Sequence, residues 1–371
     1  MNLLDRLSAL VAIDSHSSTD NTPIISLLQS WFADYSTEIQ EWKREDGVQG
    51  KNLLVTIPGK SKEKTLVFVG HTDTVPSSPS WSTDPLKVVE KDGKLYGLGT
   101  CDTKGGIAAV IEAAFTLTEK PSYDTVLVFD GDEEMSSVGA ITYQKSLSLK
   151  NPLFICLEPT FQQVHIGQRA LLKCTLIAKG QAIHAGQATP ENSAMNNAIN
   201  KMHHIMSMLI DDAKELGKQS DPLLGSNTQN FGIIQGGTAR NVFASSCQVV
   251  FERRLLTSLN PQKEFERLSS LIQKVEPDVQ LVLDQIEPGF STKEDDPFVQ
   301  NVLSAVKKVY PASITAAFPA WSEAGLVSQN GPAVIVGPGD IAKNAHRANE
   351  YVEKEELLSY VTIFQDILLQ K

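Results

Sequence analysis

Histidine and aspartate side chains follow an apolar, strand-like segment early in this sequence. The stretch "VFVGHTDTVP" (67–76) places His71 and Asp73 where a buried strand is expected to end. Asp102 lies further on, in the glycine-rich turn "GLGTCDTKGG" before a helix-like segment. In open α/β sheets, ligands bind at this edge of the strands. Taken alone, each motif has a plainer explanation, because aspartate and threonine are common turn residues.

More carboxylates and a second histidine occupy similar positions later in the chain. Glu133 and Glu134 follow the strand-like "TVLVFD", and Glu158 follows "LFIC". His346 lies in the loop after the late strand "AVIVG". If these strands share one sheet, we expect their polar groups to converge at one edge of it.

Several carboxylates gathered in one buried site repel each other unless a cation neutralises them. Imidazole and carboxylate ligands suit zinc, cobalt or manganese. The set is larger than one tetrahedral zinc ion needs, but it suits two ions if one carboxylate bridges them. Two ions ~3.5–4 Å apart activate a shared water and polarise a carbonyl. The candidate ligands are His71, Asp102, Glu134, Glu158 and His346.

Two further acidic residues fit supporting roles at such a site. The Asp73 carboxylate can hold the second ring nitrogen of His71 and fix its tautomer. Adjacent side chains in an extended segment point in opposite directions, so Glu133 can stay free while Glu134 binds metal. Glu133 is therefore the candidate general base. The turn around Asp102 lacks the GxxxxGK[ST] spacing of a nucleotide-binding loop.

Composition narrows the class of protein. The 371 residues suggest two domains, and 41% hydrophobic with 21% charged residues is ordinary for a globular protein. A net charge of −11 argues against a nucleic-acid partner. No run approaches the roughly 18 apolar residues of a membrane span, and the N-terminus does not read as a signal peptide. Scattered cysteines without CxxC spacing favour a cytoplasmic location; they are Cys101, Cys156, Cys174 and Cys247.

Helix and strand patterns predict an α/β protein with an insertion. Residues 1–167 and 287–371 alternate strands and helices, which predicts a mixed sheet flanked by helices. Residues 168–286 follow the order β-α-β-β-α-β, which is the ferredoxin-like arrangement. We therefore expect a second domain inserted into the first.

Through these motifs the chain resembles the M20 family of co-catalytic zinc metallohydrolases. The matching segments are "GHTDTVP", "GLGTCDTKGGIAA", "DGDEE", "LEPT" and a late "AH", which together span residues 70–346. The resemblance implies a zinc-peptidase-like catalytic domain over 1–167 and 287–371. It also implies that residues 168–286 form a lid and dimerisation domain, and hence a homodimer.

The resemblance assigns the ligands to two ions, Zn²⁺ or Co²⁺. His71 and Glu158 would bind one ion and Glu134 and His346 the other, with Asp102 bridging both. Asp73 would orient His71, and Glu133 would be the general base.

Three lid residues also acquire roles from the resemblance. His184 in "GQAIHAG" would stabilise the oxyanion, and in the family this histidine reaches across a dimer interface. Asn241 in "GGTARNV" and Arg254 in "FERRL" would contact the substrate carboxylate, for which an arginine fork is suited. The neighbouring Arg240 and Arg253 remain alternatives to Arg254.

The segment "PAWSEAGL" (319–326) resembles that of family members acting on N-acetylornithine or N-acetylcitrulline. We expect Glu323 and Gly325 in it to contact substrate. The expected reaction converts N2-acetyl-L-ornithine to L-ornithine and acetate, a step of arginine biosynthesis. Alternative substrates are N-acetylcitrulline and N-succinyl-diaminopimelate. The chain could also be a dipeptidase or a carboxypeptidase of the same family. A non-catalytic binding protein is the alternative from another class.

Overall fold

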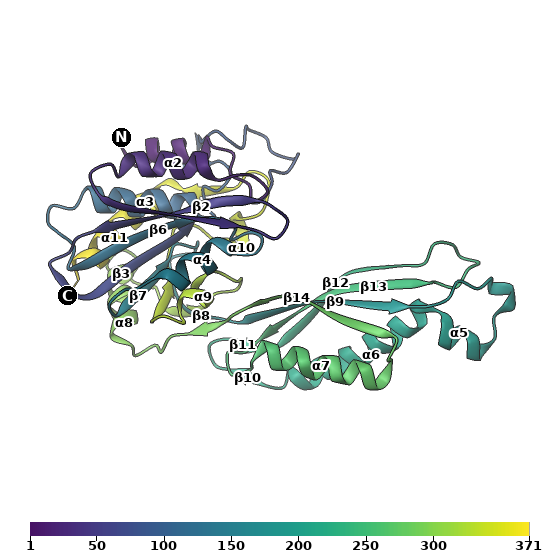
Figure 1. Ribbon diagram of the computed structural model, residues 1–371. Coiled ribbons are helices and arrows are strands. Elements are labelled where there is room, and N and C mark those ends of the chain that lie inside the picture. The colour runs from purple at the N-terminus through teal and green to yellow at the C-terminus, as the bar shows by residue number, and fades with distance from the viewer. Residues whose placement is uncertain (371) are drawn as a thin grey trace. The chain divides into compact units, whose positions relative to one another are not determined.

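The computed structural model describes residues 1–370, which divide into two compact units (Figure 1). Unit 1 comprises Met1–Gln168 and Phe290–Lys371, and unit 2 comprises Arg169–Gly289. Unit 2 is therefore an insertion in the sequence of unit 1.

Unit 1 is built on a mixed sheet that has nine strands within residues 1–370, in the order β1-β2-β6-β3-β7-β17-β8-β15 with β16 beside β8. The strand β3 pairs in parallel with both β6 and β7, whereas β1, β2 and β6 pair antiparallel. The predicted mixed sheet is confirmed. Its strands are β1 (Ser36–Lys43), β2 (Gln49–Ile57), β3 (Ser61–His71), β6 (Tyr123–Asp130), β7 (Pro152–Cys156), β8 (Val164–Gln168), β15 (Phe290–Ser291), β16 (Thr315–Ala317) and β17 (Ala333–Ile335).

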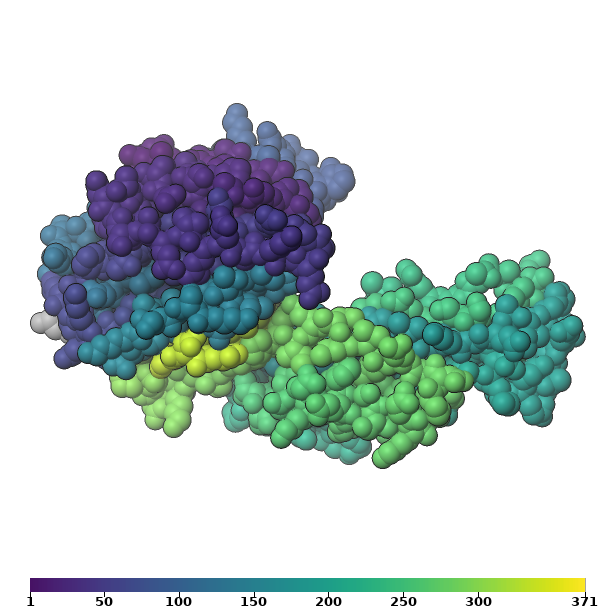
Figure 2. Space-filling model, in the orientation of Figure 1, coloured from purple at the N-terminus to yellow at the C-terminus, as the bar shows by residue number. Residues whose placement is uncertain are grey.

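Helices cover both faces of this sheet (Figure 1). In Figure 2 the purple N-terminal segment, which contains α1 and α2, forms an outer layer of unit 1. A small sheet of β4 (Val89–Lys91), β5 (Lys94–Tyr96) and β18 (Tyr351–Glu353) lies apart from the main one. The helices are α1 (Leu3–Val11), α2 (Thr22–Trp31), α3 (Lys104–Phe115), α4 (Val138–Ser146), α8 (Pro297–Val309), α9 (Ala324–Val327), α10 (Ile341–Asn344) and α11 (Lys354–Leu369).

The apolar run of β3 explains why this strand is central. Alternate side chains of a strand point to opposite faces, so a strand covered on both faces is apolar throughout. Phe68 packs edge-on against Phe364 of α11, with ring centroids 5.6 Å apart. Val67 and Val69 point to the other face, where they join a core with residues of α4 and α9. Burial on both faces fixes β3, and with it the position of its polar end.

Unit 2 contains an antiparallel sheet of four strands among its described residues, in the order β12-β13-β9-β14. Along the chain its main elements run β9, α6, β12, β13, α7, β14. Apolar residues of α6 and α7 pack with those of β9 and β13 in a separate core. The elements are β9 (Ala170–Lys179), η1 (Ala185–Gln187), α5 (Pro190–Asn196), α6 (Ala198–Leu216), β10 (Ser220–Asp221), β11 (Gly225–Ser226), β12 (Thr228–Gly236), β13 (Ser246–Leu255), α7 (Pro261–Val275) and β14 (Val279–Glu287).

None of the helices formed by residues 1–370 combines the length and apolar character needed to cross a membrane.

Candidate metal centre

Three parallel strands bring polar residues to one edge of the sheet in unit 1. His71 is the last residue of β3, and Glu158 follows the end of β7 by two residues. Glu133 and Glu134 follow the end of β6, the other parallel neighbour of β3. Because parallel strands end at the same edge, these side chains become neighbours despite their distance in sequence.

Asp102 reaches this edge from the turn before α3. Its backbone N–H and that of Cys101 donate to Oε1 of Glu350, at 3.0 and 2.9 Å. The hydroxyl of Thr103 donates to the backbone oxygen of His71 at 3.1 Å, which joins the turn to the end of β3. A Cβ atom at Gly106 would lie 2.7 Å from the backbone oxygen of Leu157. Only glycine there lets α3 approach the segment that carries Glu158.

The predicted ligands form two groups of three that share Asp102. In the first group, ligand atoms of His71, Asp102 and Glu158 lie within 4.8 Å of one another. In the second, those of Asp102, Glu134 and His346 satisfy the same distance. The structure therefore brings together all five side chains that the sequence singled out as ligands.

The two oxygens of Asp102 face different histidines. Oδ1 lies 3.0 Å from Nε2 of His71, and Oδ2 lies 3.3 Å from Nε2 of His346. Each histidine also contacts a glutamate through the same nitrogen. Nε2 of His71 lies 3.6 Å from Oε1 of Glu158, and Nε2 of His346 lies 2.9 Å from Oε2 of Glu134. One carboxylate between two imidazole–carboxylate pairs is the arrangement that a bridging ligand requires.

The histidines and the central aspartate hold opposite charges. Hydrogen bonds to Asp102 and Glu134 raise the pKa of His346 to about 11. Burial opposes protonation of His71, but hydrogen bonds to Asp102 and Asp73 still raise its pKa well above the usual value. Burial works against the charge of Asp102 too, yet hydrogen bonds to both histidines lower its pKa.

The glutamates of the site are less easily ionised. Burial raises the pKa of Glu158 and Glu133 well above the usual value, and that of Glu134 to a smaller extent; the charge of Asp102 adds to each shift. A divalent cation among them would favour the ionised forms by direct attraction. The donor set, with imidazole nitrogen and carboxylate oxygen in both groups, fits such a cation.

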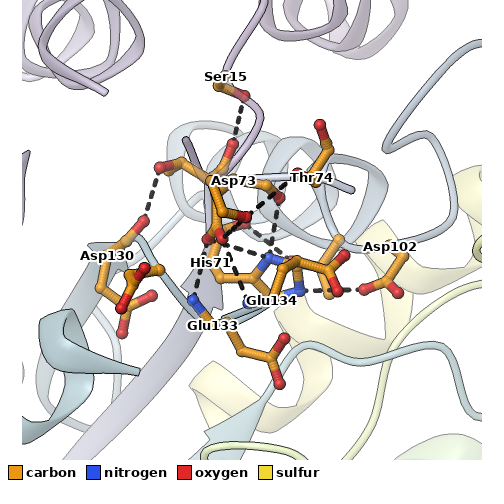
Figure 3. Close-up of polar contacts among 12 residues, drawn as sticks. Ser15, His71, Asp73, Thr74, Asp102, Asp130, Glu133 and Glu134 are labelled. Atoms are coloured by element: carbon orange, nitrogen blue, oxygen red, sulfur yellow. Dashed lines mark hydrogen bonds and ion pairs between the residues drawn. The ribbon is translucent and has the colours of Figure 1, made fainter. Parts of the chain in front are cut away.

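Asp73 connects His71 to the segment that contains Glu133 and Glu134, called here the glutamate segment (Figure 3). Its Oδ1 and Oδ2 accept hydrogen bonds from the backbone N–H groups of Glu133 and Glu134, at 3.2 and 3.3 Å. Nδ1 of His71 lies 3.0 Å from the backbone oxygen of Asp73 and 3.6 Å from its Oδ1. Asp73 thus faces the ring nitrogen that points away from Asp102, mainly through its backbone.

Comparison with known proteins agrees with this geometry. A model of the peptidase family M20/M25/M40 matches residues 67–370. An acetylornithine deacetylase from Myxococcus xanthus is 30% identical over 364 residues, which cover 95% of this chain and 93% of the relative. The chain belongs to peptidase family M20/M25/M40. It is therefore a metal-dependent hydrolase of amide bonds.

Solved structures of M20 proteins share the fold. An M20 metallo-carboxypeptidase from Sulfolobus solfataricus superposes with a TM-score of 0.82 at 19% identity, over 99% of this chain and 98% of the other. A Bacillus subtilis protein described as a dinuclear metal-binding M20 peptidase superposes with a TM-score of 0.70 at 13% identity. The match covers 99% of this chain and 96% of the other.

A second pair of acids lies in the interior of this M20 chain. Asp130, at the end of β6, and Glu323, which precedes α9, have exposures of 0% and 3%, and each carboxyl group influences the pKa of the other. Burial raises the pKa of Asp130 to about 7 and that of Glu323 well above the usual value. Within residues 1–370, both Asp130 oxygens lack a hydrogen-bond donor. Burial therefore favours the protonated form of both carboxyl groups.

Substrate contact by Glu323 and Gly325 stays a prediction. Glu323 is directed toward Asp130, and Gly325 is buried within α9.

In unit 2, the structure brings His184 and Asn241 close together. His184 forms an isolated β-bridge with Val242, and the N–H of Ala185 donates to the backbone oxygen of Asn241 at 2.8 Å. The His184 and Asn241 side chains are exposed. Nδ1 of His184 accepts a hydrogen bond from the N–H of Gly186 at 3.1 Å.

The structure narrows the choice of substrate-binding arginine. Arg253 is fully buried and pairs with Glu264 and Asp212, at 2.5 and 2.8 Å, so its guanidinium already has partners inside unit 2. Arg254 is partly exposed and contacts Glu252 at 2.9 Å. Arg254 and the exposed Arg240 remain the candidates.

Several residues that support the site carried no signal in the sequence. Ser17 and Arg44 lie in polar stretches outside every motif, and Asp132 lies in the motif "DGDEE" without having been assigned a role there. The Asp130–Glu323 pair joins residues far apart in the sequence, and neither has a spacing that points to the other.

We predict that Asp130→Asn flattens the pH dependence of stability. The raised pKa means that the folded state keeps a proton that the unfolded state loses above about pH 4, so stability falls as pH rises toward 7. Between pH 4.5 and 8, metal-free wild type should lose at least about 1.4 kcal/mol more unfolding free energy than Asp130→Asn. Urea unfolding measures this, with the exposed Asp34→Asn as control. Equal slopes for wild type and Asp130→Asn would contradict the raised pKa of Asp130.

Proposed function

We propose that this M20 hydrolase removes the acetyl group from N2-acetyl-L-ornithine, giving L-ornithine and acetate. The observation that carries the reaction class is the pair of ligand groups that share Asp102 beside Glu133. The choice of substrate is supported by the Myxococcus relative, which covers nearly the whole chain. The reaction would belong to arginine biosynthesis in the cytoplasm, and the four buried free thiols suit a reducing compartment.

We propose that two divalent ions, Zn²⁺ or Co²⁺, occupy the two groups. His71 and Glu158 would hold one ion, Glu134 and His346 the other, and Asp102 both. When bound, the ions polarise the acyl carbonyl and make water a stronger nucleophile. Asp73 keeps the ring of His71 in the tautomer that leaves Nε2 available.

Glu133 moves the protons of the reaction. It belongs to neither ligand group, although it adjoins Glu134 and shares the anchor at Asp73. As general base it takes a proton from the attacking water. As general acid it returns this proton to the amide nitrogen when the C–N bond breaks. The second proton of the water also passes to the amine, so the products are a carboxylate and an ammonium group.

Residues of unit 2 bind the substrate in this proposal. His184 would donate to the oxyanion, and Asn241 with Arg254 would hold the α-carboxylate. These roles rest on the family resemblance of their segments. The partly exposed guanidinium of Arg254 is consistent with a role in binding.

We further propose that unit 2 is a ferredoxin-like lid and the dimerisation domain. Its element order and strand order support the first point. The edge strand β12 supports the second, because Ile233 and Ile234 on it are more than half exposed. An exposed apolar edge strand is a surface onto which a second copy can pair.

We predict that N2-acetyl-L-ornithine is hydrolysed with kcat/KM at least about 10-fold above N-acetyl-L-citrulline, N-succinyl-diaminopimelate and dipeptides. Amine release from Zn²⁺- or Co²⁺-loaded protein measures this, and a chelator should abolish it. Preference for acetylcitrulline would keep the chemistry and change the substrate. No turnover of any of these amides by metal-loaded protein would contradict the proposal.

Glu133→Gln should lower kcat by about 10²–10⁴-fold, because the amide cannot accept the proton of water. The metal content should be unchanged, since Glu133 belongs to neither ligand group. Steady-state kinetics and metal analysis measure the two effects, with the exposed Glu63→Gln as control. Full turnover by Glu133→Gln would show that another group is the base.

A further inference from the structure

Arg44 lies between β1 and β2 and makes four polar contacts with a side chain that is only 9% exposed. Nε and Nη2 contact the carboxylate of Asp46, at 2.9 and 2.6 Å. Nη1 donates to Oδ1 of Asp132 at 2.7 Å and to the backbone oxygen of Ser17 at 3.0 Å. Asp46 lies on the same hairpin, but Asp132 and Ser17 belong to segments that surround the metal centre.

Asp132 holds the turn that begins with the two glutamates. Its backbone oxygen accepts hydrogen bonds from the N–H groups of Ser136 and Ser137, at 3.1 and 2.6 Å. Its Oδ2 accepts from the Ser136 hydroxyl at 2.5 Å and from the N–H of Val138 at 3.2 Å. The backbone of Asp132 has a φ of +75°, which a non-glycine residue adopts only when its surroundings enforce it. Its carboxylate is 0% exposed, so the cation of Arg44 is what balances it.

Ser17 connects Arg44 to the other anchor of the same segment. The Ser17 hydroxyl donates to Oδ2 of Asp73 at 2.8 Å. Asp73 in turn accepts the backbone N–H groups of Glu133 and Glu134. Arg44 is therefore linked to the glutamate segment by two routes. One runs through Asp132, which precedes Glu133 in the chain, and the other runs through Ser17 and Asp73.

We propose that Arg44 is a positioning residue for Glu133 and Glu134. This inference rests on the proposed function for its kinetic consequence, because that function makes Glu133 the base and Glu134 a ligand. A displacement of about 1 Å at a catalytic group costs about 10²-fold in rate. Loss of a partner that orients metal ligands costs about 10–100-fold in metal affinity or activity.

A purely structural ion pair would behave differently. The pairing of Arg44 with Asp46 on the hairpin could stabilise the fold without influence on the site. Arg6 is the matched control: its side chain is also 9% exposed, and it pairs with Glu112 at 3.1 Å between α1 and α3. Arg6→Met therefore removes an equally buried arginine whose ion pair does not touch the glutamate segment.

The experiment compares Arg44→Met, Arg44→Lys and Arg6→Met. Zn²⁺ is titrated into metal-free protein against a chromophoric chelator. We expect the weaker of two Zn²⁺ sites to lose about 10–100-fold in affinity in Arg44→Met, with kcat falling about as much and KM little changed. Arg44→Lys should recover only part of the loss. It keeps the positive charge, but one ammonium cannot serve Asp46, Asp132 and Ser17 together. Zn²⁺ affinity in Arg44→Met within twofold of Arg6→Met would overturn the proposal.

Two additions keep the test decisive. If Arg44→Met does not fold, Asp132→Asn removes the same ion pair with little change in shape and should weaken the same Zn²⁺ site, whereas Asp46→Ala should not. Hydrogen exchange of residues 131–138 should be faster in Arg44→Met than in Arg6→Met, and this readout needs neither metal nor substrate. If wild type binds Zn²⁺ but hydrolyses no N-acyl amino acid, the proposed function fails while the Arg44 comparison still decides this inference.

Discussion

The carboxylate of Asp102 lies between two histidines, and the Nε2 atom of each histidine that faces Asp102 also faces a glutamate. Four carboxylates within this small space, counting Glu133, repel one another unless positive charge lies among them. The rest of unit 1 is arranged around that constraint. The ends of the parallel strands β3, β6 and β7 supply the histidine and the glutamates, and Glu350 accepts a hydrogen bond from the backbone N–H of Asp102.

The ligands differ in how firmly the fold holds them. Side chains of His71, Asp102, Glu134 and Glu158 are at most 8% exposed, whereas that of His346 is 53% exposed. His346 follows the short helix α10 and has a φ of +56°. His71, Glu134 and Glu158 end or follow buried strands, and hydrogen bonds to Glu350 and His71 hold the turn of Asp102. His346 depends more on its contacts with Asp102 and Glu134. Binding of metal should therefore order the loop of His346 more than any strand end.

The sequence predicts the parts of the site that follow from local pattern. Apolar runs such as that of β3 locate buried strands, and the polar residues after them are the ligands found together. The edge strand β1, "STEIQEWK", was not predicted, because an exposed edge strand needs no apolar run. The role of Arg44 was not predicted either, because its partners Ser17 and Asp132 are distant in sequence and come near it only when the sheet forms. The partner of Glu323 likewise depends on how α9 packs on β7 and β17, which no spacing in the sequence encodes.

The most direct test of the shared carboxylate is an anomalous difference map from crystals of the Zn²⁺-loaded protein. We expect two peaks ~3.5–4 Å apart, one on each side of the Asp102 carboxylate. One peak would lie near His71 and Glu158, and the other near Glu134 and His346. A single peak, or two peaks of which either is away from Asp102, would contradict the account.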